Sequence, residues 1–367
     1  MAEYRIIDAD GHVMELDSEL NEHIGPPYKD LEWHRSYSFW PGLTMDGFLR
    51  ALRNPGGWAG GGSGPHAQDW LDFLDKNGIE ISVLYPTQGL THAAIRDRDW
   101  AVALARAYND WIHHRFMEAS PRLVGVALLP VQDINEAVKE LRRCVTELGM
   151  VGAVLPAVAV GGKVYSGPEF YPLWEEAQRL DVPVSTHGGL SFPDLGLDLL
   201  NNFTVGHCLE HPFAQMRHLV SMIFEGVFEL FPKLRYGCLE CGVGWVPYMM
   251  DRMDEEQERK GQYSPRCKLK PSEYLRRGNI FFAAEVGESA LPLAAEVLGS
   301  DALIWASDYP HERDQRDFSE DIPTLIRRSD ISDGLKRKIF FDNTLRFYPR
   351  LRERLQKGEP VFRAAAV

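Results

Sequence analysis

The chain has 367 residues, of which 44% are hydrophobic and 25% are charged, as is ordinary for a globular protein. Its formal net charge of −13 argues against nucleic-acid or anionic-membrane partners, because both need clustered lysine and arginine. No apolar run approaches the ~18 residues of a membrane span, and the charged first residues lead us to expect no secretory signal. The five cysteines, an odd number, favour a reducing compartment, so we expect a cytoplasmic protein.

Short apolar segments rich in β-branched residues alternate with longer helical segments along the whole chain. The predicted strands are 4–10, 79–86, 123–130, 152–156, 182–187, 234–240, 280–284 and 303–308. Segments with helical periodicity include 98–118, 134–148, 169–180, 213–228, 289–298 and 332–341.

The alternation of strand and helix predicts an α/β protein with a (β/α)₈ TIM barrel. The predicted strands are nearly continuous apolar runs, as expected when helices cover a parallel sheet. A doubly wound sheet is the alternative. Long connections follow the first and fifth predicted strands, over 13–78 and 188–212. Both connections therefore begin at the face of a barrel where active sites lie. The glycine-rich run 56–64 within the first connection is either a lid or an ordinary surface loop.

Four of the eight predicted strands end in side chains that bind metal ions. The first ends in Asp10 and His12, which share one face because strand side chains alternate. The others end in His187, Glu240 and Asp308. Imidazole nitrogens and carboxylate oxygens suit Zn, Mn or Fe(II), so the pattern predicts a divalent-metal site.

These residues resemble the amidohydrolase-related family, in the branch with aminocarboxymuconate semialdehyde decarboxylase and the resorcylate and carboxyvanillate decarboxylases. The resemblance rests on Asp10-x-His12, on His187, on 231–254 (FPKLRYGCLECGVGWVPYMMDRMD) and on 305–312 (WASDYPHE). It implies a metal-dependent enzyme with a small-molecule substrate, one amidohydrolase-like domain over 1–367 with a core at about 4–348, and a homodimer.

The resemblance assigns metal ligation to Asp10, His12, His187 and Asp308. The family has a histidine or glutamate at the position of Asp10, and the semialdehyde decarboxylase has a catalytic histidine at that of Glu240. Both changes add an anionic oxygen ligand, which favours Mn or Fe over Zn. Asp308 would also exchange protons, Glu240 would be a general acid/base or a bridging ligand, and His311 is a further candidate catalytic residue.

Three activities fit this set of residues. In hydrolysis of a small organic acid or amide, the metal lowers the pKa of bound water and Asp308 accepts its proton. In nonoxidative decarboxylation, Asp308 or Glu240 supplies the proton that replaces CO₂. The third activity, an alternative to these two, is that of a dinuclear Fe or Fe/Mn oxygenase. In that enzyme Glu240 would bridge two ions, and His207, His211 or His311 would complete the second site. Because Asp10 departs from the family pattern, a second alternative is a noncatalytic subunit in a hetero-oligomer with a catalytic homologue.

The sequence leaves the roles of two further pairs of residues open. On a helix, His207 and His211 would share a face, but Pro212 disfavours helix at His211, so we expect a loop that ends at a helix start. Arg217 and Arg252 are candidates for binding a substrate carboxylate, because a guanidinium group matches a carboxylate bidentately.

Overall fold

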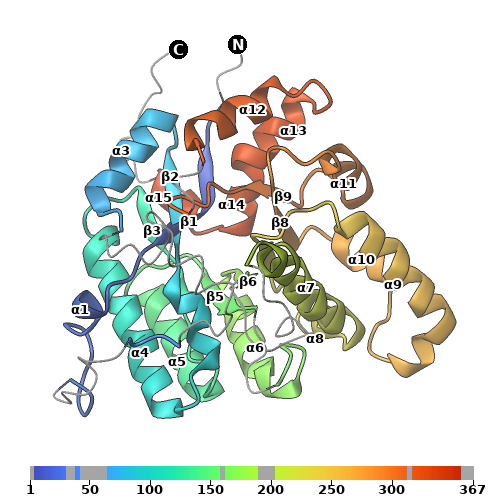
Figure 1. Ribbon diagram of the computed structural model, residues 1–367. Helices are drawn as coiled ribbons and strands as arrows, with labels where there is room; N and C mark the ends of the chain where they lie inside the picture. The colour runs from blue at the N-terminus through green and yellow to red at the C-terminus, as the bar shows by residue number, and fades with distance from the viewer. Residues whose placement is uncertain are drawn as a thin grey trace.

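The computed structural model describes residues 4–29, 38–41, 64–157, 162–188, 203–311 and 316–356. Within these residues, short strands run through the middle of the molecule, and helices cover them from outside (Figure 1). The strands are β1 (Ile7–Val13), β2 (Ile81–Pro86), β3 (Leu123–Gly125), β4 (Ala127–Leu128), β5 (Ala153–Pro156), β6 (Val184–His187), β7 (Tyr236–Leu239), β8 (Ile280–Ala284) and β9 (Leu303–Trp305).

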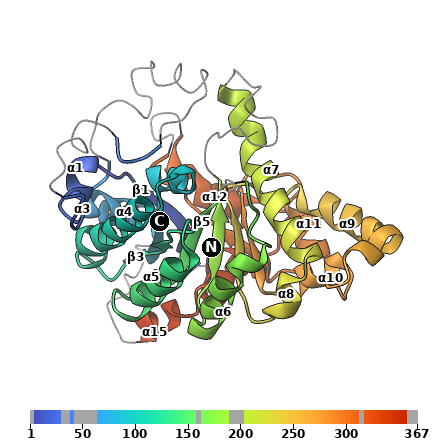
Figure 2. The ribbon, with the colours of Figure 1, turned by 90° about the horizontal axis from the view of Figure 1, so that it is seen from below.

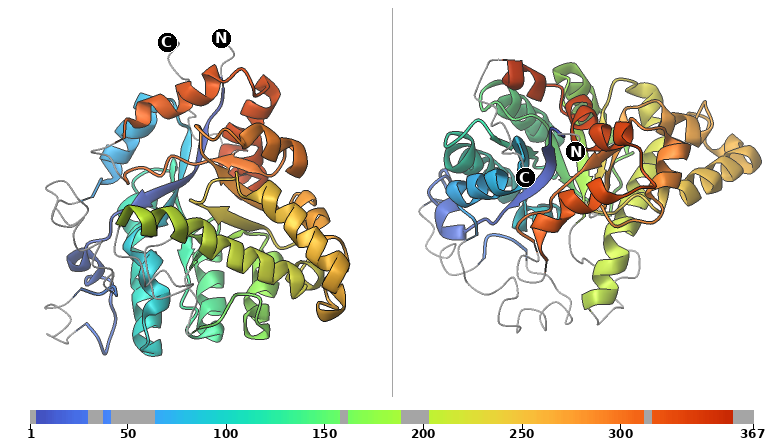
Figure 3. Two further views of the ribbon diagram at one scale, coloured as in Figure 1. Left: turned by 45° about the vertical axis from the view of Figure 1, so that its right-hand side comes forward. Right: turned by 90° about the horizontal axis from the view of Figure 1, so that it is seen from above.

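The helices of the described residues alternate with the strands and form the outer layer, as both views in Figure 3 show. They are α1 (Asp17–Leu20), α3 (Ala67–Asn77), α4 (Arg98–Ile112), α5 (Ile134–Thr146), α6 (Tyr171–Leu180), α7 (Phe203–Phe224), α8 (Val227–Leu230), α9 (Val246–Lys260), α10 (Pro271–Arg276), α11 (Leu291–Leu298), α12 (Asp321–Arg327), α13 (Asp333–Arg337), α14 (Asn343–Phe347) and α15 (Leu351–Gln356). Not one of them has both the length and the apolar character needed to cross a bilayer.

The strands pair in chain order and all run parallel, in the groups β1-β2-β3 and β4-β5-β6-β7-β8-β9. β3 and β4 are one strand interrupted at Val126, whose N–H donates to the carbonyl of Leu84 in β2. The eight positions are therefore filled in sequence without the reversal of strand order that defines a doubly wound sheet.

Backbone hydrogen bonds also join the end of the strand series to its beginning. The N–H of Asp308, just after β9, donates to the carbonyl of Asp10 over 3.0 Å. The N–H of His12 donates to the carbonyl of Tyr309 over 2.7 Å. The last strand therefore lies against the first, as the expected (β/α)₈ barrel requires.

The predicted elements are found, with shifted ends. The first strand was expected at 4–10, but β1 spans Ile7–Val13, so His12 lies within the strand instead of after it. The last strand was expected to reach Asp308, but β9 ends at Trp305. The glycine-rich run up to residue 63, and residues 189–202 of the other long connection, lie outside the described residues.

The expectation of a loop through His211 is wrong. Helix α7 begins at Phe203 and continues through Pro212, and Figure 2 shows its first turns extending beyond the body of the barrel. An internal proline removes one helical hydrogen bond and costs about 3 kcal/mol. The later turns of α7 bury Leu219, Met222 and Ile223 completely in the core, and this packing offsets the cost.

Asp8 lies in β1, one layer beneath the strand ends, and its hydrogen bonds link β1 to the residues that follow β9. Its fully buried carboxylate accepts hydrogen bonds from the Ser307 N–H (2.8 Å), the Ser307 hydroxyl (2.8 Å) and the Ser82 hydroxyl (2.6 Å). We expect Asp8→Ala to lower the free energy of unfolding by about 3 kcal/mol, because it leaves buried donors without an acceptor. In chemical denaturation, Asp8→Asn should lose only about 1 kcal/mol, and equal losses for the two variants would contradict this role.

Candidate metal centre

Asp10, His12 and His187 meet at the carboxyl ends of β1 and β6. All three are buried, with at most 2% of their surface exposed. The Nε2 atom of His187 lies 3.0 Å from Oδ2 of Asp10 and 3.1 Å from Nε2 of His12. Three atoms that can each bind a metal ion therefore converge from two strands.

Hydrogen bonds fix which ring nitrogens of the two histidines face each other. Nδ1 of His12 lies 2.8 Å from the Pro86 carbonyl, and Nδ1 of His187 lies 2.7 Å from the Gly188 carbonyl. A carbonyl can only accept, so both Nδ1 atoms donate, and in the neutral rings both Nε2 atoms carry lone pairs. Two lone pairs 3.1 Å apart repel each other unless a proton or a metal cation lies between them.

A carboxylate oxygen at the same place also lacks a donor. Oδ1 of Asp10 is buried without a hydrogen-bond partner and lies 3.4 Å from Nε2 of His12. Metal-binding histidines characteristically hold their other ring nitrogen with a carbonyl or carboxylate, as His12 and His187 do here. The donor set therefore fits a divalent cation.

Asp308 and His311 lie on the other side of His12. Oδ1 of Asp308 is 3.7 Å from Nε2 of His12 and 2.7 Å from Nδ1 of His311. The His311 ring stacks on the His12 ring with centroids 4.0 Å apart, and its Nε2 is 2.8 Å from Oγ1 of Thr87. The structure thus places His311 beside Asp308.

Glu240 follows β7 and lies on the far side of His187. Its Oε2 atom is 3.4 Å from Nδ1 of His187 and 3.3 Å from Nε2 of His211. The ligand atoms of Glu240, His211 and His207 all lie within 4.8 Å of one another. Glu240 therefore groups with the two histidines of α7, separately from Asp10 and His12.

Glu240 and Asp308 both have left-handed backbone conformations. The φ angles are +50° at Glu240 and +55° at Asp308. Such conformations are rare outside glycine, cost of order 1–3 kcal/mol and cluster at functional sites. The strain is consistent with two carboxylates held in place for chemistry.

Burial and neighbouring charges shift the protonation of the cluster. Burial raises the pKa of Asp10 to about 6, although His187 opposes the shift. Burial, together with His311 and His187, holds the pKa of His12 well below its usual range. Burial lowers the pKa of His187, but the carboxylates of Asp10 and Glu240 outweigh it and raise the value to about 9. Without a metal, His187 therefore carries a proton near neutral pH.

Metal binding near neutral pH is expected to release about one proton per chain, because an ion bound to His187 must displace the proton held there. Apparent affinity should rise with pH until it passes the pKa of about 9, above which no proton competes. Calorimetric titrations with Mn²⁺ in two buffers of different ionisation enthalpy measure the release. Identical heats in both buffers would show that no proton is displaced.

The two predicted substrate-binding arginines have other partners. Nη2 of Arg217 donates to the carbonyl of Ala157 over 2.7 Å. Arg252 lies on α9, where it pairs with Glu255 at 3.4 Å and Glu256 at 2.8 Å, and 47% of its side chain is exposed. Arg252 therefore takes part in a surface ion-pair network, and binding of a substrate carboxylate by Arg217 or Arg252 stays a prediction.

Two charged residues near the cluster were not predicted from the sequence. Arg316 places Nη1 3.7 Å from Oδ2 of Asp308 and Nη2 2.6 Å from Oδ2 of Asp321. Glu285 directly follows β8, and loss of hydration raises its pKa to about 7, with Arg316 opposing and Asp308 adding to the shift. The acidic residue directly after β8 is a sequence signal that could have added Glu285 to the predicted site.

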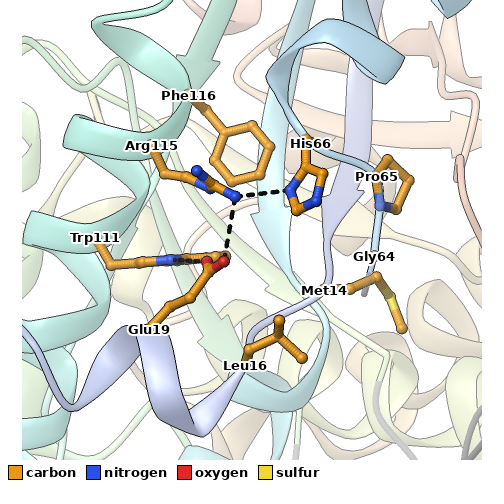
Figure 4. A pocket seen from close by; sticks show the side chains of 9 residues that line it. All are labelled: Met14, Leu16, Glu19, Gly64, Pro65, His66, Trp111, Arg115 and Phe116. Carbon is orange, nitrogen blue, oxygen red and sulfur yellow. Dashed lines mark hydrogen bonds and ion pairs between the residues drawn. The ribbon is translucent and has the colours of Figure 1, made fainter. Parts of the chain in front are cut away.

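A small pocket outside this cluster lies between α1 and the end of α4 (Figure 4). Arg115 places Nη2 3.2 Å from Oε1 of Glu19 and 2.8 Å from Nδ1 of His66, and the Trp111 indole donates to Glu19 over 2.7 Å. These polar groups satisfy one another, and no predicted site residue lines the pocket. We assign it a structural role.

The fold and the strand-end cluster together define a metal-binding barrel of the amidohydrolase type. The family model for amidohydrolases matches residues 7–350, so the chain belongs to the amidohydrolase family, as the resemblance implied. Gamma-resorcylate decarboxylase of Rhodococcus jostii is 32% identical over 263 residues, which are 66% of this chain and 76% of that protein. The 2-amino-3-carboxymuconate-6-semialdehyde decarboxylase of Dictyostelium discoideum is 27% identical over 281 residues, or 76% and 75% of the two chains.

Solved structures share the fold over nearly the whole chain. A 5-carboxyvanillate decarboxylase from Sphingomonas paucimobilis superposes with a TM-score of 0.72 at 23% identity, covering 95% of this chain and 99% of that one. A dihydroxybenzoic acid decarboxylase from Polaromonas sp., with bound manganese and the inhibitor 2-nitroresorcinol, superposes with a TM-score of 0.70 at 21% identity, covering 96% and 99%. These similarities confirm the predicted barrel.

Proposed function

We propose that this protein catalyses the metal-dependent, nonoxidative decarboxylation of a small carboxylic acid. One divalent ion would be held by Asp10, His12, His187 and Asp308. The observation that carries the proposal is the convergence of the Nε2 atoms of His12 and His187, 3.1 Å apart, with carboxylate oxygens beside them. The decarboxylases among its relatives favour this reaction over hydrolysis of an amide.

The ligand set supports Mn or Fe as the ion. Two imidazoles and two carboxylates form a harder donor set than the nitrogen- and sulfur-rich sites of zinc. The manganese in the Polaromonas enzyme agrees with this choice. When bound, the cation would polarise substrate oxygens beside the carboxylate that leaves.

In the reaction, the bond between a substrate carbon and its carboxylate breaks, CO₂ leaves, and the electron pair stays on the carbon. That carbon must then gain one proton. We assign delivery of this proton to Asp308, whose Oδ1 lies 2.7 Å from Nδ1 of His311. Burial lowers the pKa of His311, but Asp308 and Glu240 outweigh it and the net shift is upward, so the ring can resupply the proton. Thr87 fixes the other ring nitrogen of His311.

We further assign Arg316 to orienting an anionic group of the substrate. Its guanidinium lies over the Phe318 ring, 5.0 Å from the centroid, and beside Asp308. Its side chain is 24% exposed, so part of it can be reached from solvent. A guanidinium binds a carboxylate through two parallel hydrogen bonds, which would hold the scissile group in one orientation.

The proposal is tested by incubating the Mn²⁺-loaded protein with 2,6-dihydroxybenzoate and related hydroxybenzoic acids in D₂O. We expect CO₂, together with a product that carries one deuterium at the former carboxylate carbon. The same yield without oxygen would separate this reaction from that of an oxygenase. Release of an amine or alcohol from amides or esters, without CO₂ from any acid, would identify a hydrolase and contradict the proposal.

A noncatalytic subunit is the less favoured alternative, because Asp10, the residue that departs from the family pattern, still places its carboxylate among the other candidate ligands, 3.0 Å from Nε2 of His187. The proposal includes a cytoplasmic location and assembly as a homodimer, with a hetero-oligomer of homologous subunits as the alternative. Light scattering of the purified chain distinguishes self-assembly from the need for a second subunit.

A further inference from the structure

A second group of possible ligands lies on the other side of His187. His207 and His211 lie one turn apart on α7, with ring centroids 4.6 Å apart. Nε2 of His211 is 3.3 Å from Oε2 of Glu240, and one ligand atom from each of the three residues lies within 4.8 Å of the others. This arrangement exists because α7 continues through Pro212.

The hydrogen bonds of His211 leave its lone pair facing a carboxylate. Nδ1 of His211 lies 3.2 Å from the backbone carbonyl of His207, so Nδ1 donates and Nε2 of the neutral ring carries the lone pair. That lone pair points at a carboxylate oxygen of Glu240, another acceptor. Two acceptors 3.3 Å apart require a proton or a cation between them, as in the first cluster.

The surroundings hold these side chains in place. His211 is only 6% exposed, and its ring packs against the backbone of Gly188. A Cβ at Gly188 would lie 1.9 Å from Cδ2 of His211, so glycine is needed for the ring to approach. The positive φ of Glu240 is an independent sign that this carboxylate has a constrained position.

We propose that His207, His211 and Glu240 bind a second divalent cation. The two cation sites would be separated by the ring of His187, whose Nε2 faces Asp10 and whose Nδ1 lies 3.4 Å from Glu240. Three protein ligands leave a coordination position open, as in catalytic sites, whereas structural sites close all four. The second cation can therefore also bind water or a substrate oxygen.

The stoichiometry of Mn²⁺ binding tests this proposal independently of any catalytic activity. We expect the wild-type protein to bind about two Mn²⁺ per chain, with the electron paramagnetic resonance lines of each ion broadened by the nearby second ion. His211→Ala and His207→Ala should each bind one ion and show the unbroadened six-line spectrum. The control is His114→Ala, which removes an exposed histidine that stacks on His23 outside both clusters, and it should still bind two.

Two results would overturn the proposal. The first is saturation of the wild-type protein at one Mn²⁺, which would leave a proton shared by His211 and Glu240 as the explanation. The second is binding of two ions by both histidine variants. If His211→Ala does not fold, because its ring packs on Gly188, the half-buried His207 provides the deciding variant.

Discussion

Replacing His187 by alanine is expected to remove the ion from the first site and to lower kcat/KM by more than about 100-fold. Loss of a residue that only supports a ligand typically costs 10–100-fold in metal affinity or activity, so loss of a ligand should cost more. His187 is the most sensitive position because its Nε2 lies within 3.1 Å of both Asp10 and His12. Elemental analysis after dialysis, combined with steady-state kinetics, measures both effects.

The matched control for this variant is His92→Ala. His92 is also fully buried, but its Nε2 lies 2.8 Å from the carbonyl of Ala101, and burial lowers its pKa to about 4. Its loss should reduce stability and leave the bound metal in place. A His187→Ala protein that keeps its full complement of metal would show that the assigned ligand set is wrong.

The sequence predicted the barrel because its strands are covered by helices and therefore consist of apolar runs. The ends of strands were harder to predict, as β1 shows. Its last residues include Asp10, Gly11 and His12, which look like the start of a loop, but they remain in the strand. Barrels place polar functional side chains at the carboxyl ends of their strands, so polarity there does not mark the end of a strand.

The sequence named Glu240 and three histidines as candidates for a second metal site, but it could not predict which of them lie together, because that depends on tertiary packing. The local rule that a residue before proline avoids helix is a statistical preference, and burial of α7 overrides it at His211. Sequence spacing also left His207, His211 and His311 as equal candidates for one site. The fold separates them, since the loop after β9 brings His311 to Asp308 while α7 brings the other two to Glu240.

Arg316 shows a different limit of prediction from sequence. It lies in the connection after β9, outside any strand or helix, and nothing in its neighbourhood in the sequence distinguishes it from other arginines. Only the folded chain shows that it lies 3.7 Å from Asp308 and 2.6 Å from Asp321. Arginines that bind substrate depend on such long-range placement, which the sequence could not show for Arg217 and Arg252 either.

Replacing Asp308 by asparagine is expected to lower kcat by about 10³-fold, within the range for loss of a general acid or base. The amide oxygen can still lie against the metal, but the amide cannot take up and deliver a proton. Metal content should therefore stay near the wild-type level, in contrast to His187→Ala. Measuring kcat and bound metal on the same preparation separates loss of proton transfer from loss of the ion.

Two further variants show whether the proton comes from Asp308 or from elsewhere. Asp321→Asn removes the other carboxylate that pairs with Arg316, so it controls for disturbance of that arginine and should change KM more than kcat. Glu240→Gln tests the second carboxylate close to His187. If Glu240→Gln abolished turnover while Asp308→Asn kept it, the proton would come from Glu240. The ion pair of Asp308 and His311 would then only position groups around the metal.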